Sequence, residues 1–276
     1  MPGRWVAGTM DIWWKAVGTA VSVALVIITA RRAHRRLAGL VAAFPTVTAP
    51  ALVWLAHDQG PTFAAAAAVA TVAGCVMQAG FALGYARASR KLGPAGALGC
   101  SLAAAAGLAS LTLAIGNQLA PAVLAAVAGV ALGKLLLPAA CGAARVVRAA
   151  PGGGLGEITL TVVASVLLSM LAASLGAHWG PVVAGLLASL PVVCGTVAVV
   201  EHMRHGPAAA GEFLHAYTSG LFGRVLFGAA FALAAPAWGA GWALLLAMVA
   251  SIAAAAAAYG PARAAAPPSS RAAQRA

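Results

Sequence analysis

Charged residues are scarce in this sequence. They make up only 8% of the 276 residues, and just five of them are acidic, whereas 62% of the residues are hydrophobic. A soluble protein of this size needs a polar surface, and this composition cannot provide one. Apolar runs of about 20 residues recur along the whole chain, which is typical of helices that cross a bilayer. The sequence therefore predicts an all-α, polytopic transmembrane bundle forming a single membrane domain over residues 1–260.

The sequence also lacks the motifs of common catalytic and cofactor sites. It contains no phosphate-binding loop, no Ser/His/Asp set and no paired catalytic carboxylates. The four cysteines have no CxxC spacing and fall in or at the ends of apolar runs, where they act as small apolar fillers (Cys75, Cys100, Cys141 and Cys194). We expect no enzyme activity, no cofactor and no resident metal.

The basic residues gather in short segments between the apolar runs and give the chain a net charge of +12. This distribution follows the positive-inside rule and argues against a nucleic-acid partner. We predict nine spans, at 14–30, 37–56, 62–86, 94–115, 121–140, 158–176, 182–201, 208–234 and 240–259. With the N-terminus outside and the C-terminus in the cytoplasm, the inner segments hold most of the Lys and Arg residues. The tail at 261–276 is rich in Pro, Ala, Ser and Arg, and we expect it to be disordered.

Two parts of the chain resemble each other when the sequence is shifted by 146 residues. Residues 38–86 then align with 184–232 without a gap. Glycines and prolines coincide at five places, which alanine richness does not easily explain: Gly39/Gly185, Pro45/Pro191, Gly60/Gly206, Pro61/Pro207 and Gly74/Gly220. We predict a repeat at about 11–115 and another at about 157–260. The linking span at about 121–140 would invert the second copy, as in many secondary transporters.

Each copy carries a proline near the middle of a span, Pro45 in the second span and Pro191 in the seventh. Proline removes a helix hydrogen bond, so both helices are expected to break near the midplane. Small and hydroxyl side chains surround the breaks, and we predict that they line a substrate site (Thr46, Thr48, Cys194 and Thr196). The alternative is a pair of kinks that only shape packing, with hydroxyls bonding back to their own helix.

Arg224 lies deep within the eighth predicted span, and its counterpart in the first copy is Gln78. A charge within a span usually faces a cavity or a partner, so both side chains are predicted to line the route, with an anionic substrate favoured. The alternative is a structural arginine that bonds to carbonyls freed by the broken helices. Lys134 lies nearer the inner end of its span and can reach the headgroups.

Histidine and glutamate gather at the inner end of the second copy. We predict that these side chains form a proton-linked gate (Glu201, His205, Glu212 and His215). A metal site or an intramembrane enzyme at these residues is a less favoured alternative.

The segment "AGLVAAFPT" (38–46), followed by "HDQG" (57–60), resembles the small bacterial inner-membrane GlpM-like proteins. The whole chain looks like duplicated, uncharacterised bacterial membrane proteins that carry a Gly-Leu-x-x-x-[Phe/Leu]-Pro pattern twice. The resemblance implies an integral protein of the inner (plasma) membrane, and it supplies no substrate.

The sequence thus predicts a secondary transporter or permease for a small solute, working by alternating access around the second and seventh spans. The alternative is a non-transporting assembly or envelope-maintenance factor whose repeats build a scaffold. The lipid bilayer is the expected partner, and the sequence leaves a homo-oligomer open.

Overall fold

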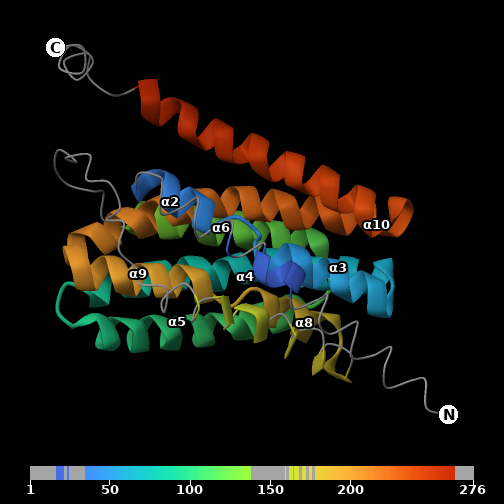
Figure 1. Ribbon diagram of the computed structural model, residues 1–276, viewed down its shortest axis with the longest axis horizontal. Helices are drawn as coiled ribbons and strands as arrows, with labels where there is room; N and C mark the ends of the chain where they lie inside the picture. The colour runs from blue at the N-terminus through green and yellow to red at the C-terminus, as the bar shows by residue number, and fades with distance from the viewer. Residues whose placement is uncertain are drawn as a thin grey trace.

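The computed structural model describes residues 35–137 and 178–264, with isolated residues within 17–24 and 159–175. These residues form helices and no strands, which confirms the all-α prediction for this part of the chain (Figure 1). The helices are α2 (Arg35–Ala42), α3 (Thr48–Gln59), α4 (Pro61–Ala88), α5 (Pro94–Ile115), α6 (Leu119–Leu136), α8 (Pro181–Ala188), α9 (Val192–His205) and α10 (Pro207–Ala264).

Five segments are long and apolar enough to cross a membrane: Pro61–Ala88, Pro94–Ile115, Leu119–Leu136, Pro181–His205 and Pro207–Ala257. Such segments are compatible with an integral membrane protein. Much of the first and sixth predicted spans and of the tail lies outside the described residues, so the count of nine stays a prediction. Residues 261–264, which we assigned to the tail, instead continue α10.

The last of these segments is too long for one crossing. Its 51 residues would span about 76 Å as a straight helix, against about 30 Å of hydrocarbon. Gly239 interrupts it with φ 76° and ψ 167°, a conformation that glycine adopts without a Cβ clash. The chain reverses there, so α10 is a hairpin of two helices (Figure 1).

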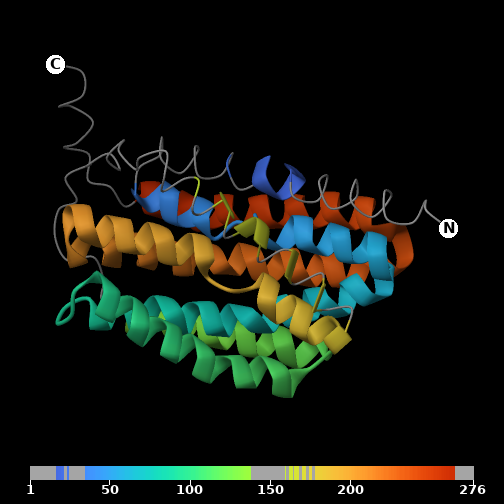
Figure 2. The ribbon, with the colours of Figure 1, turned by 60° about the horizontal axis from the view of Figure 1, so that its bottom comes forward.

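Two sharp turns at glycine set the ends of the broken spans. Gly60 (φ 92°) joins α3 to α4, and Gly206 (φ 82°) joins α9 to α10. Each is followed by a proline at the first helical position, where its missing N–H costs nothing. The two turns lie at opposite ends of the bundle (Figure 2).

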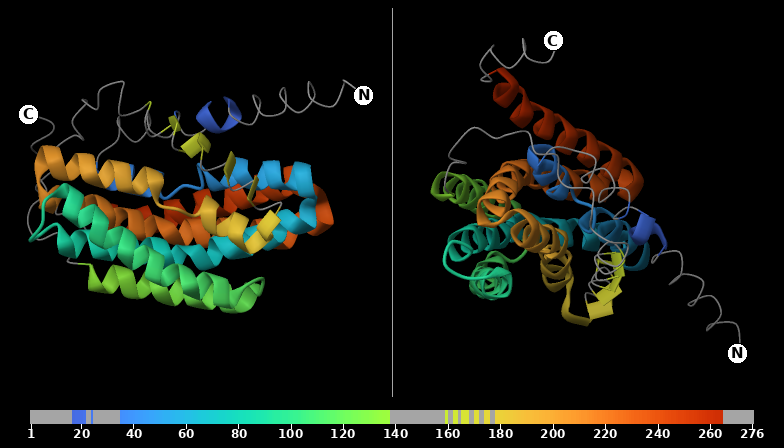
Figure 3. Two further views of the ribbon diagram at one scale, coloured as in Figure 1. Left: turned by 90° about the horizontal axis from the view of Figure 1, so that it is seen from below. Right: turned by 60° about the vertical axis from the view of Figure 1, so that its left-hand side comes forward.

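Helix α4 lies at the centre of the bundle and contacts α3, α5, α6, α8 and α10 (Figure 3). Its small side chains allow the close approach of these neighbours. The sequence has two GxxxG patterns, at 80–84 and 129–133, and their glycines serve the same packing within the chain: Gly80 and Gly84 face α5, while Gly129 and Gly133 face α4.

The short helices α2 and α8 each pack on a helix of the other half of the chain: α2 contacts α10, and α8 contacts α4. Gly39 of α2 lies against the α10 backbone, where an added Cβ would come within 2.6 Å of Phe213 O. Gly185 of α8 lies against Ala67 O of α4. These two contacts are related by the same shift of 146 residues in both partners. The two contacts therefore lie at corresponding positions of the predicted repeat.

Candidate functional site

The candidate site lies where the second and seventh predicted spans break. The segment 43–47 separates α2 from α3, and 189–191 separates α8 from α9. At the second break the Val192 amide bonds to Leu190 O at 2.9 Å instead of continuing the α-helical pattern. The carbonyl of Ala188 therefore lacks its usual amide donor four residues on. Carbonyls freed in this way need other donors inside a membrane.

Arg224 of α10, which belongs to the same predicted copy as α8 and α9, reaches this break. Its side chain is buried, and Nη2 donates hydrogen bonds to Thr48 Oγ1 and, at 3.2 Å, to Ala188 O. The Thr48 hydroxyl, fully buried at the start of α3, donates to the same carbonyl at 3.0 Å. The guanidinium thus caps the C-terminal end of α8, where the helix dipole favours a positive charge.

Gln78 of α4 supports the same end of α8. It is 1% exposed, and its Nε2 donates to Ser189 O at 2.6 Å. The two polar residues that correspond in the repeat therefore bind consecutive carbonyls of one broken helix. No side chain of the described residues donates to the corresponding carbonyls of Ala42 and Ala43 at the first break. We call Thr48, Gln78, Arg224 and the carbonyls of Ala188 and Ser189 the polar cluster. The polar cluster is asymmetric, because its side chains bind the end of α8 and not the end of α2.

Two hydrogen-bonding atoms of the polar cluster are not used within it. Within the part of the chain that the structure describes, Gln78 Oε1 and Arg224 Nε are buried without a hydrogen-bond partner. Among the residues that the structure describes, no carboxylate pairs with Arg224. A buried charge without a counterion is costly, and carbonyl dipoles offset only part of the cost. The cluster therefore retains one donor, Arg224 Nε–H, and one acceptor, Gln78 Oε1, for a further polar partner.

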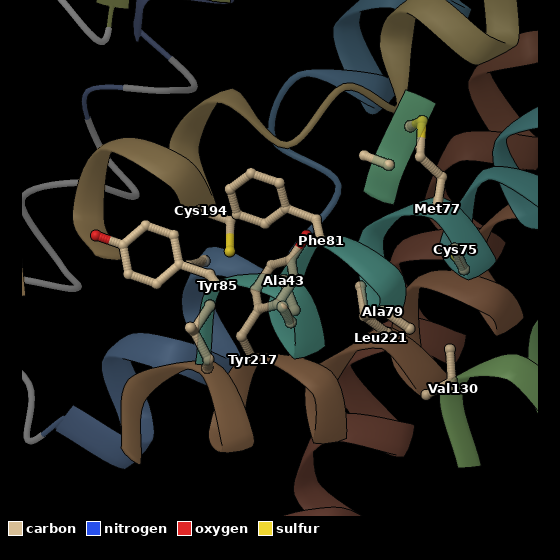
Figure 4. Close-up of a cluster of buried hydrophobic side chains, with 14 of the residues drawn as sticks. Ala43, Cys75, Met77, Ala79, Phe81, Tyr85, Val130, Cys194, Tyr217 and Leu221 are labelled. Atoms are coloured by element: carbon tan, nitrogen blue, oxygen red, sulfur yellow. The ribbon is translucent and has the colours of Figure 1, made fainter. Parts of the chain in front are cut away.

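The side chain of Cys194, at the start of α9, lies among aromatic residues of the hydrophobic core (Figure 4). It is 2% exposed, and its sulfur lies beside the hydroxyl of Tyr217, among the rings of Phe81 and Tyr85 (Figure 4). Its counterpart in the first copy is Thr48, so only one of the two equivalent positions binds the arginine. Pro45 and Thr46 are buried within the first break.

Pro191 and Thr196 take a different place from the other predicted site residues. They line an apolar groove of about 600 Å³ between α4, α5 and α9. The Thr196 hydroxyl bonds back to Val192 O at 2.9 Å within α9. This is the arrangement that the packing alternative anticipated for the hydroxyls, and here it applies to one threonine and not to Thr48.

The predicted gate residues lie at the end of α9 and the start of α10. His205 Nδ1 is 3.2 Å from Glu201 Oε2, and neighbouring His202 Nδ1 is 3.3 Å from the Tyr85 hydroxyl. Glu212 and His215 follow in the first turns of α10. Within the described part of the chain, no three His, Cys, Asp or Glu residues are placed to hold a metal ion.

The acceptors of the cluster are main-chain carbonyls, as the structural alternative for Arg224 anticipated, but the sequence did not single out which ones. Ala188 and Ser189 carry no chemical signal of their own, and only Pro191, a few residues later, indicates that carbonyls are freed nearby. Lys134, by contrast, is exposed near the end of α6, consistent with a side chain that reaches for the headgroups.

Comparisons with known proteins found no counterpart for this chain: no family model, no curated protein and no solved structure matches it.

Proposed function

We propose that the protein is a secondary transporter of the inner membrane that moves a small anionic solute by alternating access. The observation that carries the proposal is Arg224, a buried cation at a helix break with no carboxylate partner among the described residues. A positive charge inside a membrane span is usually functional. The half-helix end beside it offers polar groups that a solute can bind or displace.

In this proposal the chain makes nine crossings, in two copies of opposite orientation. Three features support the inverted repeat. The helix bounds correspond when shifted by 146 residues, the glycine contacts of α2 and α8 correspond in the same way, and the turns at Gly60 and Gly206 lie at opposite ends of the bundle. The basic inner segments orient the N-terminus outside.

The asymmetry of the cluster suggests how the site would change sides. Exchanging the roles of the two copies turns the bond from Gln78 to Ser189 O into one from Arg224 to Ala43 O. In the alternate state, we expect Arg224 and Gln78 to cap α2 instead of α8. Movement between two equivalent sets of carbonyls would open the site first to one side and then to the other.

Flux in proteoliposomes tests the proposal. A panel of labelled organic and inorganic anions is screened with wild type, Arg224→Gln and, as a matched control, Lys134→Gln, which removes the exposed cation of α6. We expect at least one anion to be taken up by wild type and the control, with at least tenfold lower flux for Arg224→Gln. Equal flux in all three proteins would contradict the assignment of the site.

A non-transporting scaffold is the second candidate, and one observation favours it. Gln78 and Thr48 are almost completely enclosed, as expected for a cluster that only caps a broken helix. The absence of flux for every solute, in a wild-type preparation shown to be folded, would support the scaffold. A relationship to GlpM-like proteins is compatible with either function.

A further inference from the structure

The apolar groove beside the second break differs in character from the polar cluster. Its walls come from α4 (Phe81), α5 (Leu98 and Leu102) and α9 (Gly195 and Val199). Leu102 is 49% exposed on the outer surface of the bundle, so the groove opens sideways. In a membrane this side faces the acyl chains of the lipid, and the groove is therefore accessible from the bilayer.

The groove and the polar cluster meet at the same short segment of chain. Leu190 and Pro191 line the groove, and Ser189, the residue before them, presents its carbonyl to Gln78. On α4, Phe81 lies three residues after Gln78, which places both side chains on neighbouring parts of one helix face. The apolar groove thus adjoins the chain segment whose carbonyls Gln78 and Arg224 bind.

At the corresponding position of the first copy, the described residues form packed core. Ala49, the counterpart of Gly195, packs with Phe227 and Leu244, the counterparts of Phe81 and Leu98. The same set of positions therefore forms packed core on one side of the bundle and a groove on the other. The groove therefore lies beside the break between α8 and α9, whose carbonyls Arg224 and Gln78 bind.

We infer that the transported solute is an amphiphile with one anionic head and an apolar chain, which reaches the site sideways from the bilayer. This inference rests on the proposed function and names its substrate class. The apolar walls suit a hydrocarbon chain, whereas a fully hydrated inorganic anion would lose its water there without compensation. The charge of Arg224 suits the head: the guanidinium would move from the carbonyl of Ala188 to the head, and the Thr48 hydroxyl would remain as the donor to that carbonyl.

Binding of alkyl sulfonates to the protein in lipid nanodiscs tests the substrate class. Decane-1-sulfonate and ethanesulfonate share a permanently charged head, so neither crosses the bilayer as a neutral acid. Each buried methylene strengthens binding about fourfold. We expect decane-1-sulfonate to bind at least tenfold more tightly than ethanesulfonate, after subtraction of empty nanodiscs, and equal affinities would overturn the inference.

Substitutions locate the binding. Val199→Trp fills the groove away from the polar cluster, whereas Leu124→Trp places the same ring on the exposed face of α6, where Leu124 is 71% exposed. We expect at least a tenfold loss of decane-1-sulfonate affinity for Val199→Trp and none for the control. Leu102→Trp on the opposite wall repeats the test if Val199→Trp does not fold. Unchanged binding in the folded groove variants would overturn the inference.

The two proposals fail in different ways. If the flux of short anions depends on Arg224 but not on chain length or on Val199→Trp, the transporter proposal is supported and the amphiphilic substrate class is contradicted. If decane-1-sulfonate binds in the groove but no flux is measured, the binding site is supported and the transporter proposal is contradicted.

Discussion

At the scale of single residues, two threonine hydroxyls have different structural roles because their hydrogen-bond partners lie at different distances along the chain. Thr48 and Thr196 both follow a helix break, and both hydroxyls are satisfied. Thr48 bonds to a carbonyl 140 residues away in sequence and also accepts from Arg224, whereas Thr196 bonds within its own turn. Only the first hydroxyl connects the two copies.

The two threonines therefore predict different costs of substitution. Thr48→Val removes a buried donor and acceptor, and we expect it to lower the free energy of unfolding by about 1–3 kcal/mol. Thr196→Val removes only a bond within its own helix, and we expect a change below about 0.5 kcal/mol. Denaturation of both variants in the same detergent measures the difference, and equal losses would contradict a connecting role for Thr48.

At the scale of helices, α2 and α8 are too short to be stable alone and depend on packing. Gly39 and Gly185 let them approach the backbone of α10 and α4, so the helices cross without an intervening side chain. Glycine in a helix interior is otherwise unfavourable by about 1 kcal/mol relative to alanine. Close packing explains why it is used here.

Alanine substitution distinguishes glycines that pack from glycines that do not. An added Cβ at Gly39 or Gly185 meets main-chain atoms that cannot move aside, and we expect Gly39→Ala and Gly185→Ala each to destabilise the protein by about 1–3 kcal/mol or more. Gly107 of α5 has no heavy atom within 4 Å of the added Cβ. Gly107→Ala should be neutral or stabilise by up to about 1 kcal/mol, and equal loss in all three variants would contradict the packing role.

A second prediction at this scale concerns the proline of the seventh span. Pro191→Ala restores an amide donor and allows α8 and α9 to join, so the carbonyls held by Arg224 and Gln78 would return to the helix. We expect stability to be retained and flux to fall at least tenfold. Full flux with a continuous helix would contradict alternating access around this break.

At the scale of the whole molecule, the correspondence between the two copies requires their equivalent turns to face opposite sides of the membrane. His57 lies near the Gly60 turn, and Met203 lies near the Gly206 turn and is 71% exposed. These turns occupy opposite ends of the bundle (Figure 2). The orientation can therefore be tested with one residue at each end.

Thiol labelling checks this orientation. In a background without the four native cysteines, His57→Cys should react with a membrane-impermeant maleimide added to intact cells, and Met203→Cys only after permeabilisation. Reaction of both in intact cells would contradict the inverted repeat, while the opposite pattern would retain the repeat and reverse the orientation predicted from the basic segments.

The sequence by itself determined where the backbone breaks and turns. Proline at 45 and 191 prevents a continuous helix, and glycine before proline at 60 and 206 permits the reversals, because these residues restrict or release the local dihedral angles. The shift of 146 residues also indicated that Gln78 and Arg224 correspond. These features depend on residues near in sequence or on a pattern within it.

Only the tertiary structure decided what Arg224 and Gln78 bind. Their acceptors are main-chain carbonyls at Ala188 and Ser189, and every residue has such a carbonyl, so side-chain identity carries no signal for them. The tertiary structure also decided that Thr48 bonds to the distant carbonyl of Ala188 while Thr196 bonds within α9. It placed the groove at the break between α8 and α9. Such contacts join residues that are far apart along the chain, and their geometry follows from how the helices pack.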